Sequence, residues 1–344
     1  MRANSRNLTL ATAVIALATF TAALHADDGA ASVAAGGIVL RKEPRITMQK
    51  EVLTIAAAGK VSVDFDFVNE TASDVTTTVA FPIPTYSYDK IYDERIPNFP
   101  NFQVSVNGAP IAYKTEVRAE RNGKDYYALL RSMKIDVEGL AGVFDPDQFI
   151  TGRPPVGLYA LSQPQRDRLV ALRLVDHDEH DHYWPDWKVR KLYYWDQIFP
   201  AGATVHIRHE YMPVAGSAQV PVEYFDPKYR AQVKRGTEQG EKGVAVFVDQ
   251  ACVEPSEAKK LGQQTGSGFR FATTVDYILT SANTWKTPIH DFELIVDANG
   301  VPPDGPLPTS FCWNGPVTRL DEHRFSAKLT DFVPSKELSV YFWQ

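Results

Sequence analysis

The amino-acid sequence predicts a mainly β fold, with two antiparallel β-sandwich-like units and a helical and loop insertion between them. Residues 61–67 alternate apolar and polar side chains without a break, which is the period of a strand with one buried face. Asn107-Gly108 is the dipeptide that best tolerates the positive φ angles of a tight hairpin. From residue 199 onward, short apolar runs recur between turn residues, which is typical of a β-sandwich.

The N-terminal unit is expected to span residues 27–135. Its first strands are predicted at residues 36–40, 46–55, 61–67 and 75–81. Pro82 and Pro84 end the last of these strands, because proline cannot donate a hydrogen bond to a ladder. Residues 102–106 and 111–117 then flank the Asn-Gly turn as the two strands of a hairpin.

The insertion is expected to span residues 136–198. Ser162 and Gln165 have the spacing of a capping box, and Pro164 lies in the first turn, so a short helix should begin there. The segment 126–133, just before the insertion, fits a helix or a strand, because its leucines do not distinguish the two.

The C-terminal unit is expected to span residues 199–344. Its strands are predicted at residues 205–211, 244–248, 269–280, 292–296, 311–313, 325–329 and 338–343. In the first of them, His209 shares a face with Ile207 and Tyr211, whereas His206 lies on the opposite face. This pattern predicts a buried, hydrogen-bonded His209, with catalysis as the alternative.

The first 26 residues have the layout of a secretory signal peptide. Arg2 and Arg6 precede an uncharged stretch that runs to Leu24, and Ala26 offers a small residue before the cut. We therefore expect export to the periplasm, or secretion, with cleavage after Ala26. An uncleaved membrane anchor is the alternative, and no later segment is long and apolar enough to span a bilayer.

The charge balance excludes some partners. Without the leader, 34 basic residues stand against 42 acidic residues, a net charge of −8. Such a surface disfavours nucleic acid, and no basic run exists that would attract anionic lipid.

Cys252 and Cys312 are the two cysteines of the sequence. Because export leads to an oxidising compartment, a disulfide between them is the simplest interpretation. Two separate buried thiols are the alternative, since free cysteine often behaves as a small apolar residue.

The densest ionisable cluster runs from Asp176 to His182 and holds three histidines and four acids. His177, His180 and His182 are candidate metal ligands, because transition metals bind imidazole and carboxylate groups. A solvated acidic loop is the alternative.

An aromatic-rich segment follows that cluster. Trp184, Trp187 and Trp195 could form a platform on which a sugar or peptide stacks. Core packing is the alternative, because large rings usually fill interiors.

Several short motifs resemble a known family. They are Gly36-Gly37-Ile38, Val68-Asn69-Glu70, the run Val79 to Pro84, Tyr277 to Thr280, Asn283-Thr284-Trp285 and Pro288-Ile289. Together they resemble the bacterial domain-of-unknown-function family 4424 over essentially the whole exported chain. The resemblance implies an exported protein of unknown activity, and it brings no catalytic residues. Residues 61–120 also resemble, more weakly, the vault and inter-alpha-trypsin domain, which implies an extracellular β-sandwich.

The sequence therefore leads to three functional hypotheses. The first is an exported protein that binds an envelope protein or a glycan, without turnover and without a cofactor. The second is a metal-dependent hydrolase that uses the histidine cluster around an open coordination position. The third is a structural module of a larger assembly, which an exposed edge strand or apolar patch would indicate.

Overall fold

The computed structural model describes residues 28–34, 37–57, 59–88, 102–140, 157–179, 182–213, 215–263, 268–299 and 306–344. Strands dominate them, and all but one of the strand pairs are antiparallel, which confirms the mainly β prediction. The expected leader, residues 1–26, lies outside the described residues. Across the described ranges, no helix has both the length and the apolar character needed to cross a membrane.

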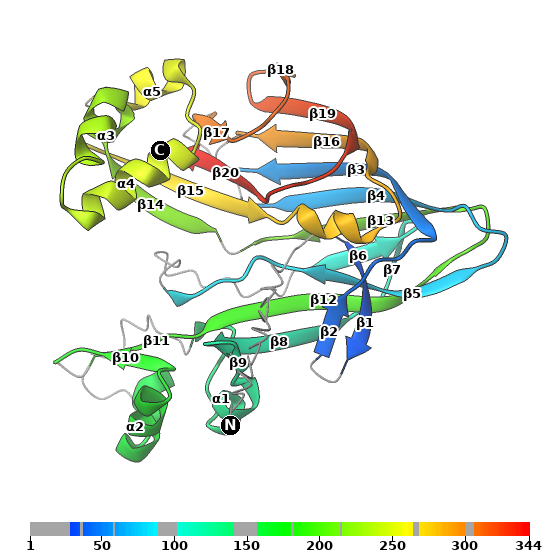
Figure 1. Cartoon of the computed structure of the whole chain (residues 1–344), viewed down its shortest axis with the longest axis horizontal. Coiled ribbons are helices and arrows are strands. Elements are labelled where there is room, and N and C mark those ends of the chain that lie inside the picture. The colour runs from blue at the N-terminus through cyan, green and yellow to red at the C-terminus, as the bar shows by residue number, and fades with distance from the viewer. Residues whose placement is uncertain are drawn as a thin grey trace, which may run out of the picture.

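An eight-stranded sheet forms the upper layer of the molecule in Figure 1. Its strand order is β18 (Val317–Arg319), β19 (Arg324–Phe332), β16 (Ile289–Asp297), β3 (Ile46–Ala56), β4 (Val61–Asn69), β13 (Thr204–Tyr211), β6 (Gln103–Val106) and β7 (Ala109–Pro110). The predicted alternation of β4 is confirmed, because every second side chain from Val61 to Asn69 is buried.

A six-stranded sheet forms the layer below it (Figure 1). Its strand order is β2 (Gly37–Leu40), β1 (Gly29–Ala34), β5 (Val75–Pro82), β12 (Lys188–Phe199), β8 (Lys114–Arg121) and β9 (Lys124–Asp125). Pro82 ends β5, as the sequence predicts.

The remaining elements lie at the ends of these two layers. A four-stranded sheet contains β14 (Gly216–Pro221), β15 (Phe269–Tyr277), β20 (Leu338–Trp343) and β17 (Thr309–Phe311), in that order. A hairpin contains β10 (Val175–His177) and β11 (Tyr183–Pro185). The helices are α1 (Tyr127–Ser132), α2 (Gln163–Ala171), α3 (Pro227–Val233), α4 (Gln239–Gln250) and α5 (Pro255–Leu261), with short 3-10 helices η4 (Gly157–Ala160), η5 (Val222–Phe225) and η6 (Thr280–Thr284).

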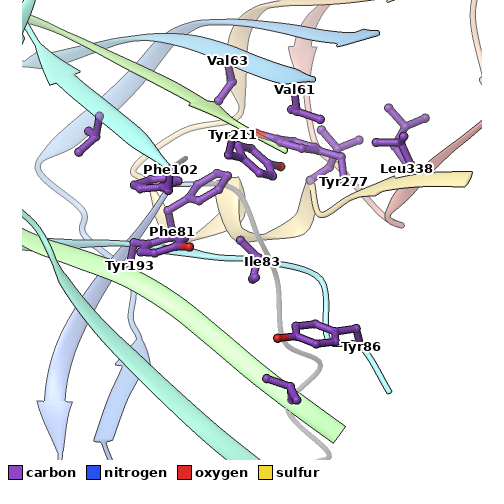
Figure 2. Packing of buried hydrophobic residues seen from close by; sticks show 14 of the residues in the cluster. Val61, Val63, Phe81, Ile83, Tyr86, Phe102, Tyr193, Tyr211, Tyr277 and Leu338 are labelled. Atoms are coloured by element: carbon purple, nitrogen blue, oxygen red, sulfur yellow. The ribbon is translucent and has the colours of Figure 1, made fainter. Parts of the chain in front are cut away.

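The core lies between the two larger sheets. Phe81 of β5 contacts Tyr211 of β13 with ring centroids 5.3 Å apart, and Phe102 stacks on Tyr193 of β12 at 3.9 Å. Figure 2 shows these four rings pointing toward one another from facing strands. Burial of such large rings is the main apolar contribution to folding.

Strand pairing crosses the expected domain boundaries. β4, from the expected N-terminal unit, pairs with β13, and β3 pairs in parallel with β16. Strands of residues 27–135 and 199–344 therefore share one sheet, instead of forming two separate sandwiches. Alternation along one strand fixes which face is buried, but it does not say which distant strand becomes the neighbour.

Two local predictions are confirmed in detail. Asn107 and Gly108 have φ angles of +51° and +80° at the β6–β7 turn. The backbone N–H of Ser162 donates to Gln165 Oε1 at 2.9 Å, which is half of the expected capping box at the start of α2. The segment 126–133, for which helix and strand were equally open, contains α1.

The prediction of a strand at residues 244–248 is wrong, because these residues lie in helix α4. Ala245 and Val248 are buried, three positions apart on one helix face, while Val246 is exposed. A five-residue apolar run has the same composition in a buried strand and in an amphipathic helix, so its pattern does not separate the two.

Candidate functional site

A groove of about 600 Å³ opens at one edge of the eight-stranded sheet. It lies over β6, β7 and β13 and is lined by Phe102, Gln103, Val104, Ser105, Gly108, Pro110, Ile111, Tyr113, Arg208 and Glu210. The register that joins His209 to Val104 and Arg208 to Ser105 brings these distant segments together. Its volume is in the range of small-molecule sites.

Aromatic side chains form the inner wall of the groove. The Tyr113 hydroxyl donates to the Phe102 carbonyl oxygen at 2.9 Å, which fixes the position of the Tyr113 ring. That ring meets Phe102 and Tyr193 edge-on, with centroids 5.1 and 5.2 Å away. Because Phe102 also stacks on Tyr193, the wall is continuous with the core between the sheets.

A charged network forms the other wall. Arg208 binds Asp64 of β4 through Nη1 and Glu210 through Nη2, the second at 2.6 Å. Glu210 also binds the Lys60 ammonium at 2.9 Å. Hydrogen bonds from Lys60 and then Arg208 lower the pKa of Glu210, so this carboxylate is ionised at neutral pH.

Two further groups extend this network along the outer sheet face. His206 Nδ1 lies 2.9 Å from Asp66 Oδ1, and its Nε2 lies 3.2 Å from Asp64 Oδ1. Fixed donors and acceptors therefore stand beside a fixed aromatic wall. Such a combination can bind sugar rings, because apolar ring faces stack on aromatics while hydroxyls hydrogen-bond to charged groups.

The opposite face of β13 carries a different kind of site. The His209 ring is fully buried and meets Phe65, Phe81, Phe102 and Trp195 with centroids 4.6 to 5.6 Å away. Burial lowers its pKa to about 3, so the ring is neutral. Its burial confirms the prediction, but its expected hydrogen bond is not found, because neither ring nitrogen has a partner among the described residues.

Asp28 lies close to this histidine, and a second buried acid, Glu51, interacts electrostatically with Asp28. Asp28 Oδ2 is 3.4 Å from His209 Nε2, without the geometry of a hydrogen bond. Glu51 of β3 accepts a hydrogen bond from the Tyr277 hydroxyl at 3.3 Å. Burial raises the pKa of both carboxyls, that of Glu51 to about 8, and Glu51 further raises that of Asp28.

Family motifs meet around Asp28. The Trp285 indole N–H donates to the Asp28 carbonyl oxygen, and Ala30 N–H donates to Thr284 Oγ1 at 3.0 Å. The ring centroids of Trp285 and Phe67 are 4.6 Å apart. Phe67 lies two residues before Asn69, whose side chain accepts a hydrogen bond from Thr71 N–H in the following turn. The Asn-Thr-Trp motif therefore holds the start of β1 and the residue before it.

The predicted histidine cluster lies on the β10–β11 hairpin. The His177 ring stacks on Tyr183, and His182 Nδ1 lies 2.8 Å from Asp178 Oδ2. His180 lies outside the described residues. Within the ranges that are described, no three His, Cys, Asp or Glu side chains converge on a metal position.

The three tryptophans do not form one exposed platform. Trp187 and Trp195 are buried, and their indole N–H groups donate to the Val137 carbonyl oxygen and to Gln197 Oε1. Their rings therefore pack in the core, as the alternative interpretation holds. Trp184, on β11, is half-buried.

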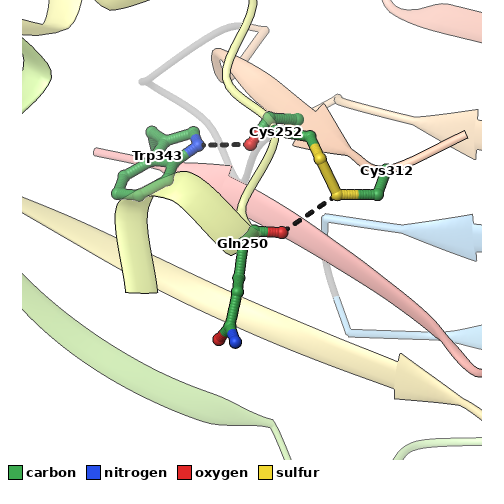
Figure 3. The surroundings of a disulfide bond; sticks show 5 residues. Gln250, Cys252, Cys312 and Trp343 are labelled. Atoms are coloured by element: carbon green, nitrogen blue, oxygen red, sulfur yellow. Dashed lines mark hydrogen bonds between the residues drawn. A yellow bond between two sulfur atoms is a disulfide. The ribbon is translucent and has the colours of Figure 1, made fainter. Parts of the chain in front are cut away.

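The predicted disulfide between Cys252 and Cys312 is present. It joins the end of α4 to the segment after β17, and the Gln250 carbonyl oxygen lies 3.1 Å from Cys312 Sγ (Figure 3). The helices α3, α4 and α5 pack on the four-stranded sheet around Phe225 and Trp343. A second cavity, of about 500 Å³, lies between α3 and α5.

Sequence reasoning missed the groove and the two buried acids. The groove combines residues about a hundred positions apart, which only the register of β6 and β13 brings together. Glu51 faces the core because a bulge between Met48 and Lys50 shifts the alternation of β3 by one residue.

Comparison with known proteins gives a family without an assigned activity. No curated protein matches the chain. Among solved structures, a candidate nutrient-binding protein of Legionella pneumophila has 15% identity and a TM-score of 0.41, and the match covers 87% of this chain and 67% of that one. An M1 zinc metallopeptidase of Deinococcus radiodurans has 10% identity and a TM-score of 0.26, and the match covers 88% of this chain and 43% of that one. The model of a domain of unknown function, DUF4424, matches residues 26–341, and the chain belongs to this family.

Proposed function

We propose that the protein is exported to the cell envelope and acts there by binding a glycan in the groove of β6, β7 and β13. The observation that supports this most is the pairing of the Tyr113 wall with the Arg208–Glu210 network across one open groove. The groove needs no chemistry of its own for this role, so the favoured activity is binding without turnover. The expected leader supports export.

The chemistry of the groove favours an uncharged or weakly charged glycan. The positive charges of Arg208 and Lys60 balance the negative charges of Glu210 and Asp64. This wall therefore offers hydrogen bonds instead of a net charge. The net charge of the exported chain, −8, would repel a strongly anionic polymer.

The proposal can be tested by cosedimentation with insoluble cell-wall glycan. Tyr113→Ala and Arg208→Met should each weaken binding at least about tenfold, which corresponds to about 1.4 kcal/mol. Arg324→Met is the matched control, because Arg324 pairs with Asp321 at the other end of the same sheet. Equal binding by all these variants, or none by the unaltered protein, would contradict the proposal.

A specific contact supports metal binding at the β10–β11 hairpin as a second candidate function. The 2.8 Å contact between His182 and Asp178 resembles the carboxylate–histidine pairs that orient metal-binding imidazoles. Metal analysis of the exported protein would test this, with His177→Ala, His180→Ala and His182→Ala together as the variant. Stoichiometric zinc that disappears in the triple variant would favour a metal site, and metal-free protein would exclude it.

A further inference from the structure

Three ionisable side chains from three parts of the chain form one fully buried cluster. Asp28 precedes β1, Glu51 lies on β3 and His209 lies on β13, and each is 0% exposed. Both Oδ atoms of Asp28, Oε2 of Glu51 and both ring nitrogens of His209 lack a hydrogen-bond partner among the described residues. A buried charge without a partner is far more costly than a buried neutral group, so the protonation state of this cluster affects the stability of the core.

The groups that face the two acids include no lysine or arginine. Asp28 Oδ2 lies 3.4 Å from His209 Nε2, and Asp28 interacts electrostatically with Glu51. The Tyr277 hydroxyl of β15 donates to Glu51 Oε1 at 3.3 Å, and Tyr211 lies on the same face of β13 as His209. In the described part of the chain, neither acid forms an ion pair with a lysine or arginine. Ionisation of either acid would therefore place an uncompensated negative charge in the core.

His209 does not supply the missing positive charge. Four aromatic rings enclose its imidazole, and burial lowers its pKa to about 3. An ion pair with Asp28 would desolvate two charges, whereas a neutral pair desolvates none. A protonated Asp28 carboxyl has an O–H donor, and a neutral His209 Nε2, 3.4 Å away, is an acceptor that a small movement brings within hydrogen-bond range. The neutral pair is therefore the favoured state.

We propose that this cluster is a proton-binding site of the folded protein, in which Asp28 and Glu51 are neutral carboxylic acids whose protons are released to water on unfolding. Burial favours the neutral form of each carboxyl, and each acid opposes ionisation of the other, because two like charges would share one desolvated site. The unfolded chain has no such preference, because its carboxyls are solvated. The cluster therefore makes the fold weaker as the solution becomes more alkaline.

The pH range of this effect follows from the proton counts. Burial raises the pKa of Asp28 and raises that of Glu51 to about 8, so between about pH 6.5 and 8 the folded state holds protons that the unfolded state has lost. Stability from the acids is therefore lost as the pH rises through this range. His209 acts in the opposite direction below about pH 6.5, because its folded pKa of about 3 means that only the unfolded chain binds a proton there. Measurements above that value isolate the two acids.

The test measures the equilibrium constant for unfolding by chemical denaturation at about pH 6.5 and about pH 7.5, where each released proton raises this constant about tenfold per pH unit. The unaltered protein should show at least that rise. Glu51→Gln, which keeps an acceptor for the Tyr277 hydroxyl, should show a rise about tenfold smaller. In Asp28→Asn/Glu51→Gln, the contribution of the cluster should be absent.

The matched control is Glu293→Gln on β16. Phe292 of β16 is the register partner of Glu51, and Glu293 is the next residue, on the outer face and 23% exposed. A neutral side chain there leaves the cluster intact. The control should therefore keep the pH dependence of the unaltered protein.

A second readout does not depend on any variant. Near pH 7 solvated carboxyls are ionised, so a carboxylic-acid carbonyl band in the infrared spectrum of the folded protein reports buried neutral acids. The band should be present in the folded protein and should disappear when denaturant unfolds the chain at the same pH.

Two results would overturn the proposal. One is an equal rise of the unfolding constant in the unaltered protein and in the double variant. The other is folded protein near pH 7 without a carboxylic-acid band. The infrared measurement decides alone if the double variant does not fold.

Discussion

The two faces of strand β13 place one residue type, histidine, in two opposite environments. On the outer face, His206 lies beside Asp64 and Asp66 in an ordered charge network. On the inner face, His209 is enclosed by aromatic rings and has no hydrogen bond to a described residue. The two histidines are three positions apart, so alternation alone separates them.

The two faces of the sheet therefore have different roles. The inner face contributes stability, because large rings from both sheets are buried against it. The outer face contributes little stability, because exposed ion pairs are screened by water. Its ordered charges and the neighbouring groove are instead suited to contact with a ligand.

The largest expected effect is the loss of a ring from the inner face. Phe65→Ala should lower the free energy of unfolding by about 3 to 5 kcal/mol, because a fully buried ring next to His209 leaves a cavity. Asp64 precedes Phe65 and lies on the outer face, so Asp64→Ala should lower the free energy of unfolding by less than about 1 kcal/mol. Chemical denaturation measures both, and similar losses would break the distinction between the faces.

The disulfide lies outside the two large sheets, in the region of the helices α3, α4 and α5. The helices α3, α4 and α5 share a second, smaller core with the four-stranded sheet, and the disulfide joins Cys252 to Cys312, 60 positions later. Replacing both cysteines by serine should cost about 2 to 4 kcal/mol, because the unfolded chain gains freedom. An unchanged denaturant midpoint would show that the helices are held by packing alone.

A smaller effect is expected at the turn that leads into the groove. Gly108→Ala should cost about 1 kcal/mol, because its φ of +80° strains a side chain. Gly240→Ala is the control, because Gly240 lies in α4 with open space around it. That change should be neutral or slightly stabilising, and an equal loss at both sites would contradict the role of the turn.

The smallest stability effect is expected at the groove itself. Arg208→Met should change the free energy of unfolding by less than about 1 kcal/mol, because Arg208 is 41% exposed. The same variant should nevertheless lose glycan binding. A large loss of stability together with the loss of binding would show that the outer face also supports the fold.

Local sequence signals predicted much of the fold. The alternation of β4, the turn at Asn107 and the cap at Ser162 each depend on neighbours in the chain, so sequence reasoning could find them. The cysteine pair could be predicted because the expected leader implies an oxidising compartment. Features that depend on distant partners could not be found, among them the parallel pairing of β3 with β16 and the groove.

The most direct test of the account is hydrogen exchange of residues 27–344 with and without soluble cell-wall glycan fragments. The account predicts slower exchange in residues 102–113 and 208–210, the two segments that contain the groove lining, and unchanged exchange in the β10–β11 hairpin. Protection of the hairpin instead, or of no segment at all, would contradict the assignment of the groove as the binding site.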